Sequence, residues 1–168
     1  MILIGSCFLA IGGAALTAER TGLPFDLEYF MTKPDVVNHL KAFAMYRVDT
    51  EKEDEIAFVV PDPGTNTKNG MFLEFERGKL VEITSTKSGM KKAQFETYLK
   101  QMLSVADKWK TSGASTVFES TTNNFYLYKD ERSYMTISGG DPSEDFSVDV
   151  SFTEKEYHET RYGKAKKQ

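Results

Sequence analysis

The sequence predicts an α+β domain in which helices pack on one face of an antiparallel sheet. Helix-type patterns occur twice, and each is followed by short stretches rich in aromatic and β-branched residues. The last stretch, Phe146 to Phe152, alternates apolar and polar residues, which is typical of an antiparallel strand with one solvated face. The repeated order of helix and then strands predicts two similar halves, at about 25–85 and 88–155.

The first half begins with a helix signal at Thr32. The Thr32 hydroxyl can cap the helix, and Pro34 occupies the first turn, where a missing N–H is harmless. Apolar residues then recur at three-to-four spacing: Val36, Val37, Leu40 and Phe43. A strand is expected at 56–60, and the runs 71–76 and 79–84 around Arg77-Gly78 predict a hairpin.

The second half begins with the strongest helix pattern of the chain, from Met90 to Trp109. Its apolar stripe consists of Phe95, Tyr98, Leu99, Met102, Leu103, Ala106 and Trp109. Strands are expected at 115–120, 125–129, 134–138 and 146–152. Gly139-Gly140 is predicted to be a turn.

The composition is typical of globular proteins, and the charge balance argues against nucleic acid as a partner. Of its 168 residues, 40% are hydrophobic and 27% are charged, and the net charge is −4. That balance provides no broad positive field for nucleic acid. The only cysteine is Cys7, which excludes a disulfide framework and a cysteine-based zinc site. We expect one domain at 19–158 and a basic tail at 159–168.

The first eighteen residues, Met1 to Ala18, carry no charged side chain and run from an apolar core into small residues. This pattern favours a cleaved secretory signal peptide and therefore an exported protein, periplasmic or extracellular. An uncleaved membrane anchor is a second interpretation, since a span needs about 17–25 residues. A lipoprotein signal ending in a lipidated Cys7 is a third, because Ile4 to Cys7 resembles a lipobox. The fourth interpretation is a buried N-terminal strand or helix of a cytosolic domain.

Two motifs resemble parts of a known family. Phe30-Met31-Thr32-Lys33, with Val36, Val37 and Leu40, looks like the turn-into-helix motif of SmpA/OmlA-type envelope lipoproteins, and the hairpin Phe72 to Leu80 is similar to their strand pair. By order of elements, the resemblance covers most of residues 25–155. It extends to β-lactamase-inhibitor-protein-like domains, which place a helical segment before an antiparallel strand set once or twice per chain. The resemblance implies an exported, non-enzymatic domain that binds another protein.

Chemical motifs are few, and we predict no catalytic, cofactor or metal residues. The two histidines, His39 and His158, have no metal-ligand spacing such as His-x-x-x-His. The acidic run Asp49 to Glu55 lacks EF-hand spacing and is interpreted as a solvated turn. An enzyme would have to use loop carboxylates such as Asp141 and Asp145. A periplasmic hydrolase or carbohydrate-binding protein of that kind is the alternative function.

Tyrosines in the second half suggest a binding surface. If Phe125, Leu127, Met135 and Ile137 face the helices, then Tyr126, Tyr128 and Tyr134 share the opposite face. Together with the nearby Arg132, they would form a protein-binding surface, since tyrosine is enriched at interfaces. The competing interpretation is ordinary cross-strand pairing or cover by another segment. An inhibitor or immunity-type protein would use the same mechanism with a different partner.

Overall fold

A computed structural model describes residues 23–41, 50–61, 67–140 and 146–163. Several segments with sequence-based predictions lie outside the described residues. They comprise the signal segment 1–18 with Cys7, the end of the first predicted helix at Phe43, the first acid of the acidic run at Asp49, the loop with Asp141 and Asp145, and the tail from 164 onward.

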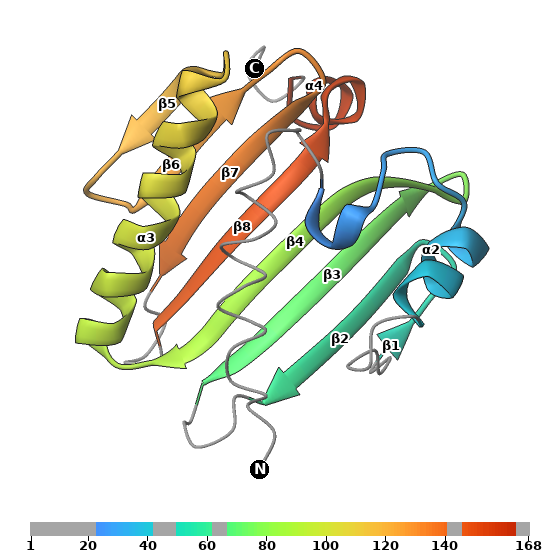
Figure 1. The fold of residues 1–168 in the computed structure, drawn as a ribbon, viewed down its shortest axis with the longest axis horizontal. Helices are drawn as coiled ribbons and strands as arrows, with labels where there is room; N and C mark the ends of the chain where they lie inside the picture. Colours follow the sequence, from blue (N-terminus) through green and yellow to red (C-terminus); the bar gives the residue numbers. More distant parts are fainter. Residues whose placement is uncertain (1–22, 42–49, 62–66, 141–145, 164–168) are drawn as a thin grey trace.

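The described residues form an eight-stranded antiparallel sheet in the order β1-β2-β3-β4-β8-β7-β6-β5 (Figure 1). The strands span Thr50–Glu51 (β1), Glu55–Pro61 (β2), Lys68–Glu76 (β3), Lys79–Met90 (β4), Ser115–Ser120 (β5), Phe125–Lys129 (β6), Ser133–Gly140 (β7) and Phe146–Glu154 (β8). Each half contributes four consecutive strands, and the last strands of the two halves, β4 and β8, pair in the centre. The predicted α+β class and its two helix-then-strands halves are confirmed.

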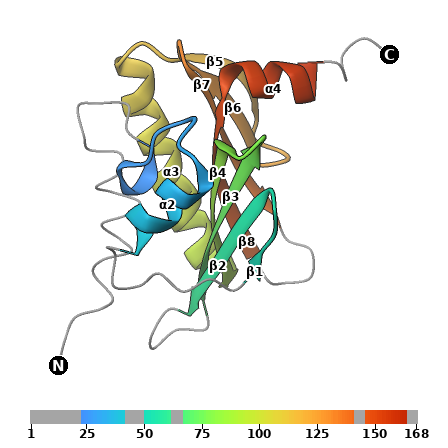
Figure 2. The ribbon, with the colours of Figure 1, turned by 90° about the vertical axis from the view of Figure 1, so that its right-hand side faces the viewer.

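Helical segments from both halves cover one face of the sheet, as Figure 2 shows. In the first half these are the short 3-10 helix η1 (Pro24–Asp26) and α2 (Lys33–Leu40), and in the second half α3 (Lys92–Thr111). The Thr32 hydroxyl accepts a hydrogen bond from the Asp35 backbone N–H, so the predicted cap of α2 is present. We call this side of the sheet the helix face and the opposite side the open face.

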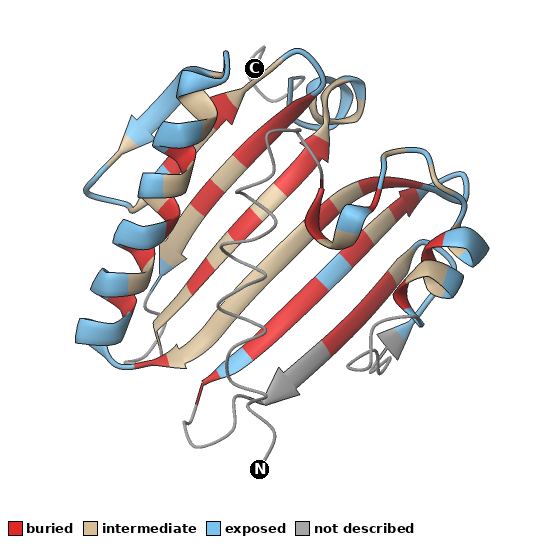
Figure 3. Ribbon diagram, in the orientation of Figure 1, coloured by how far each residue is buried: buried red, intermediate tan, exposed pale blue. Residues whose placement is uncertain are grey.

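The hydrophobic core lies between the helices and the helix face. Alternate residues of the central strands point into it, and because directly opposed residues share a face, Leu73, Ile83 and Phe152 line up across β3, β4 and β8. The helices contribute Leu27, Val36 and Leu40 from the first half, and Phe95, Leu99, Met102 and Ala106 from α3. Figure 3 shows the resulting alternation of buried and intermediate residues along the strands.

Three details differ from the sequence-based expectation. Strand β4 continues through the polar stretch after Thr84 to Met90, because β3 and β8 both hydrogen-bond to it there. Gly139 and Gly140 end strand β7 instead of forming a turn, and they pair with β8. The predicted basic tail begins in a helix, α4 (Lys155–Tyr162), whose first turn is capped by the Glu154 side chain.

None of the helices in the described part of the chain is both long and apolar enough to cross a membrane.

Candidate functional site on the open face

The predicted tyrosine surface does not exist as one surface. Tyr126 and Tyr128 lie opposite Ile137 and Met135 in the β6–β7 ladder, so all four side chains point to the helix face. Tyr126 is 7% exposed and Tyr128 is 2% exposed. The sequence-based prediction placed Phe125 and Leu127 on the helix face instead. It was wrong for β6, because the residues that point to the helix face are their neighbours Tyr126 and Tyr128. In a strand, a shift of one residue moves every side chain to the other face.

Tyr128 lies beneath the C-terminal end of α3. The Lys110 ammonium sits 5.4 Å from the centre of its ring and forms an ion pair with Asp107. Burial raises the pKa of the Tyr128 phenol, and the nearby carboxylates of Glu119 and Asp107 add to the effect. Tyr128 is therefore a core residue with its polar end at the rim.

Tyr134 does point to the open face, but α4 covers it. The Tyr134 ring stacks on the His158 ring with centroids 3.9 Å apart, and only 8% of the residue is exposed. Its hydroxyl donates to Glu159 Oε1 at 3.1 Å, and Lys129 Nζ contacts the same oxygen at 3.0 Å. Arg132 is exposed in the turn between β6 and β7, where its carbonyl accepts from the Lys155 N–H. The structure thus places Arg132 and Tyr134 beside α4, away from the other two predicted tyrosines.

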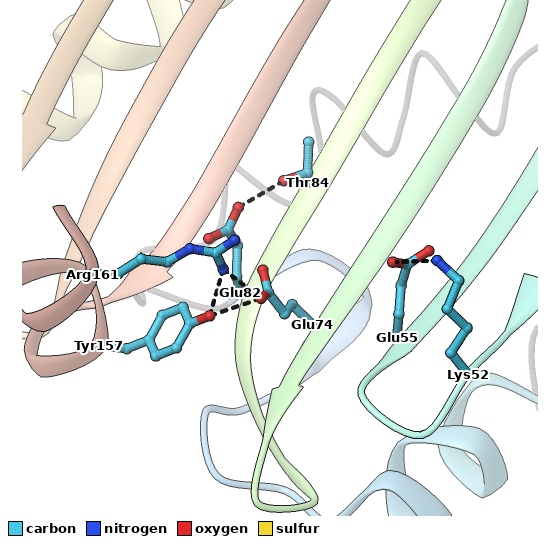
Figure 4. A network of polar contacts seen from close by, with 7 residues as sticks. All are labelled: Lys52, Glu55, Glu74, Glu82, Thr84, Tyr157 and Arg161. Carbon is cyan, nitrogen blue, oxygen red and sulfur yellow. Dashed lines mark hydrogen bonds and ion pairs between the residues drawn. The ribbon is translucent and has the colours of Figure 1, made fainter.

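A second group of polar contacts holds the other side of α4, as Figure 4 shows. Glu74 Oε1 accepts hydrogen bonds from the Tyr157 hydroxyl, at 2.7 Å, and from the Arg161 guanidinium. The Tyr157 hydroxyl also contacts Arg161. Burial and the neighbouring Glu74 raise the pKa of Tyr157 to about 12. Sequence alone could not indicate this cluster, because Glu74 and Arg161 are 87 residues apart.

Glu82 lies directly opposite Glu74 in the β3–β4 ladder, so two carboxyl groups face the same side. Burial, and then the like charge of Glu74, raise the pKa of Glu82. The Thr84 hydroxyl donates to its Oε1 at 3.3 Å, while Oε2 is buried with no hydrogen-bond partner among the described residues. A carboxyl group of raised pKa beside a second carboxyl group is an arrangement that general acid–base catalysis uses. Here Tyr157 and Arg161 bind Glu74, so Glu74 attaches α4 to the sheet.

The remaining feature of the open face is an apolar patch at the outer edge of the sheet. Phe118 on β5 is 53% exposed and Phe125 on β6 is 36% exposed, with ring centroids 6.0 Å apart. Val117 is 42% exposed beside a β-bulge between Thr116 and Phe118. We call Val117, Phe118 and Phe125 the edge patch. Strand β5 itself is exposed over nearly its whole length, as its pale blue colour in Figure 3 shows.

The other sequence-based candidates occupy ordinary structural positions. His39 Nε2 lies 2.8 Å from the Phe25 carbonyl oxygen. In the acidic run, Glu51 pairs with Lys33 at 3.4 Å and Glu55 pairs with Lys52 at 3.2 Å. Within the described ranges, no three His, Cys, Asp or Glu side chains gather closely enough to hold a metal ion.

Comparison of the chain with models of known protein families, with characterised proteins and with solved structures gives no match.

Proposed function

We propose that this chain is an exported, non-enzymatic domain that binds another protein through the β5 edge of its sheet. The observation that carries the proposal is the edge patch on an exposed outer strand. Among the described residues, β5 has β6 on one side and no strand on the other, so its outer backbone groups are available to pair with an added strand. An extended segment that joins a sheet edge gains main-chain hydrogen bonds, and pockets or apolar side chains beside the edge supply specificity.

The edge patch has the composition of a binding surface. Aromatic residues are enriched at interfaces, and scattered single apolar residues are common on any surface, whereas contiguous ones mark contact sites. Phe118 and Phe125 are contiguous, and Val117, at the bulge, is a third exposed apolar residue on the same edge strand as Phe118. A bulge also limits unspecific edge-to-edge pairing. A partner must therefore match both the edge and the patch.

The exported location rests on the sequence. The uncharged segment 1–18 favours a signal peptide, and the motif at 30–40 resembles that of envelope lipoproteins. An exported adaptor that acts through one sheet edge would need no catalytic residues.

The test is a crosslinking pull-down of the tagged full chain from its native cells, with the mature N-terminus read by mass spectrometry. Phe118→Ser should abolish capture of the enriched partner. Phe72→Ser is the matched control, because Phe72 is also on the open face, is 39% exposed and lies on β3, far across the sheet. Loss of capture with Phe72→Ser but not with Phe118→Ser would refute binding at the β5 edge. An intact Met1 on cytosolic protein would refute export.

A further inference from the structure

We infer that α4 is a detachable latch on the open face, and that its release uncovers Tyr134 and Glu82 while the sheet stays folded. This inference is independent of the proposed function, because it concerns the chain alone. It depends on how α4 is held, on what it covers and on how little of it is apolar.

Helix α4 contributes no side chain to the hydrophobic core. None of its residues is buried, and the hydrophobic core of the described residues includes no side chain from Lys155–Tyr162. At eight residues, it is also shorter than the roughly 12–15 that an isolated helix needs to be even marginally stable. Its helical form therefore depends on its contacts with the sheet, and undocking should unfold it locally.

Apart from the stack of the His158 ring on Tyr134, those contacts are polar and lie at the surface. Arg161 and Tyr157 bind Glu74 on one side of the helix, and Glu159 binds Lys129 and Tyr134 on the other. The side chains of Arg161 and Glu159 are 44% and 49% exposed. An exposed ion pair shifts an equilibrium by no more than about fivefold, whereas folded domains are favoured over unfolded ones by roughly a thousandfold or more. Each contact is weak on its own, and α4 can open separately from the sheet because no core side chain leaves with it.

The covered surface favours release. The Glu82 carboxyl is largely buried near Arg161 of α4, and its ionised form would be better hydrated with α4 removed. Docking hides Tyr134, an aromatic residue of the open face. Lys129 links this area to the edge patch, since it lies on β6 two residues beyond Leu127, which pairs with Phe118. A released α4 would therefore extend the accessible face from the edge patch towards β7 and β4.

Amide hydrogen exchange of the full chain, followed by mass spectrometry in the absence of denaturant, tests the latch. We expect the amides of 157–162 to exchange at least about 100-fold faster than those of β7 and β8, because they open without global unfolding. Arg161→Gln should speed exchange in α4 by a further factor of about 2–5 and leave the strands unchanged. Raising NaCl to 1 M should act in the same direction, since it shortens the screening length to about 3 Å.

A second readout follows the uncovered tyrosine. Nitration of Tyr134 by tetranitromethane should accelerate with Arg161→Gln, while the core residue Tyr128 stays protected. Arg77→Gln is the matched control, because Arg77 is an exposed arginine in the β3–β4 turn, and it should change neither readout. Exchange in α4 as slow as that in β7 would overturn the inference. So would an Arg161→Gln variant whose α4 exchange is unchanged, or whose strands accelerate equally.

Discussion

Gly139 offers a direct test of how α3 is seated on the sheet. A methyl group added to Gly139 would lie 2.8 Å from Phe95 Cε2 and 2.9 Å from Phe95 Cζ. Carbon atoms in favourable contact are about 3.5–4.0 Å apart, so the ring would have to retreat. Retreat is hindered because Phe95 is only 6% exposed and its ring packs on Phe146 with centroids 5.0 Å apart. The neighbouring Gly140 has nothing within 4 Å of the same added atom.

Alanine at these two adjacent positions should change the unfolding free energy in opposite directions. Overpacking a core typically costs about 1–3 kcal/mol of unfolding free energy. Replacing glycine by alanine also restricts the unfolded chain, which stabilises the protein by about 0.4–1 kcal/mol where the backbone allows it. Gly139→Ala should therefore destabilise the protein by about 1–2 kcal/mol, given both contributions. Gly140→Ala should stabilise it by about 0.4–1 kcal/mol.

Urea unfolding followed by circular dichroism measures both variants. The midpoint should fall for Gly139→Ala and rise slightly for Gly140→Ala, with the same slope for both, because the surface exposed on unfolding is unchanged. Phe95→Leu replaces the ring with a smaller side chain. Gly139→Ala should therefore lower the unfolding free energy less in that background, and the effects of the two substitutions should not be additive. If Gly139→Ala is as stable as Gly140→Ala, the contact between α3 and β7 is not as described.

Three other outcomes follow from the structure. Glu82→Gln should stabilise the protein at pH 7, because the raised pKa of Glu82 means that its ionisation opposes folding. This gain over wild type should shrink as the pH falls towards the usual glutamate pKa of about 4.3 and below. Urea midpoints measure the gain, with Glu96→Gln as the control for the lost charge. Tyr128→Ser should lower the unfolding free energy by about 3–5 kcal/mol, as for other buried aromatic residues, whereas Phe118→Ser should change it by less than about 1 kcal/mol; equal losses in a thermal melt would contradict the assigned faces. Thr32→Ala removes the cap of α2 and should cost about 1 kcal/mol in the same melt.

The order of elements could be predicted from sequence because each half carries strong local signals. The Thr32 cap, the apolar stripe of α3 and the alternation in β8 all depend on neighbours in the chain. The faces of β6 could not be predicted in this way. In Phe125 to Leu127, and again at Tyr128, every side chain is aromatic or aliphatic, so period-two alternation carries no information on which side is buried. Pairing of Tyr128 with Met135 beneath α3 decides it.

The contacts of α4 could not be predicted from the sequence either. The stretch from Lys155 to Tyr162 is polar throughout and has the composition of a solvated end. It folds because Glu74, on a strand of the first half, and Lys129, on a strand of the second, present charges to it. Helix formation that depends on distant partners leaves no periodic pattern. The same holds for the polar end of β4, which becomes a strand through its two neighbours.

The central pairing of β4 with β8 has a consequence for the order of folding events. Among the described residues, every strand pair within each half joins strands that are neighbours in the chain, and such contacts form early because they close short loops. The pairing of β4 with β8 is different, because it joins distant parts of the chain. The Thr84 and Ser151 hydroxyls lie 2.8 Å apart across a sequence separation of 67 residues. Closing so long a loop is entropically unfavourable until the ladder on both sides can form. We therefore expect each half to organise its own hairpins first, and the joining of β4 to β8 to limit the folding rate of the whole sheet.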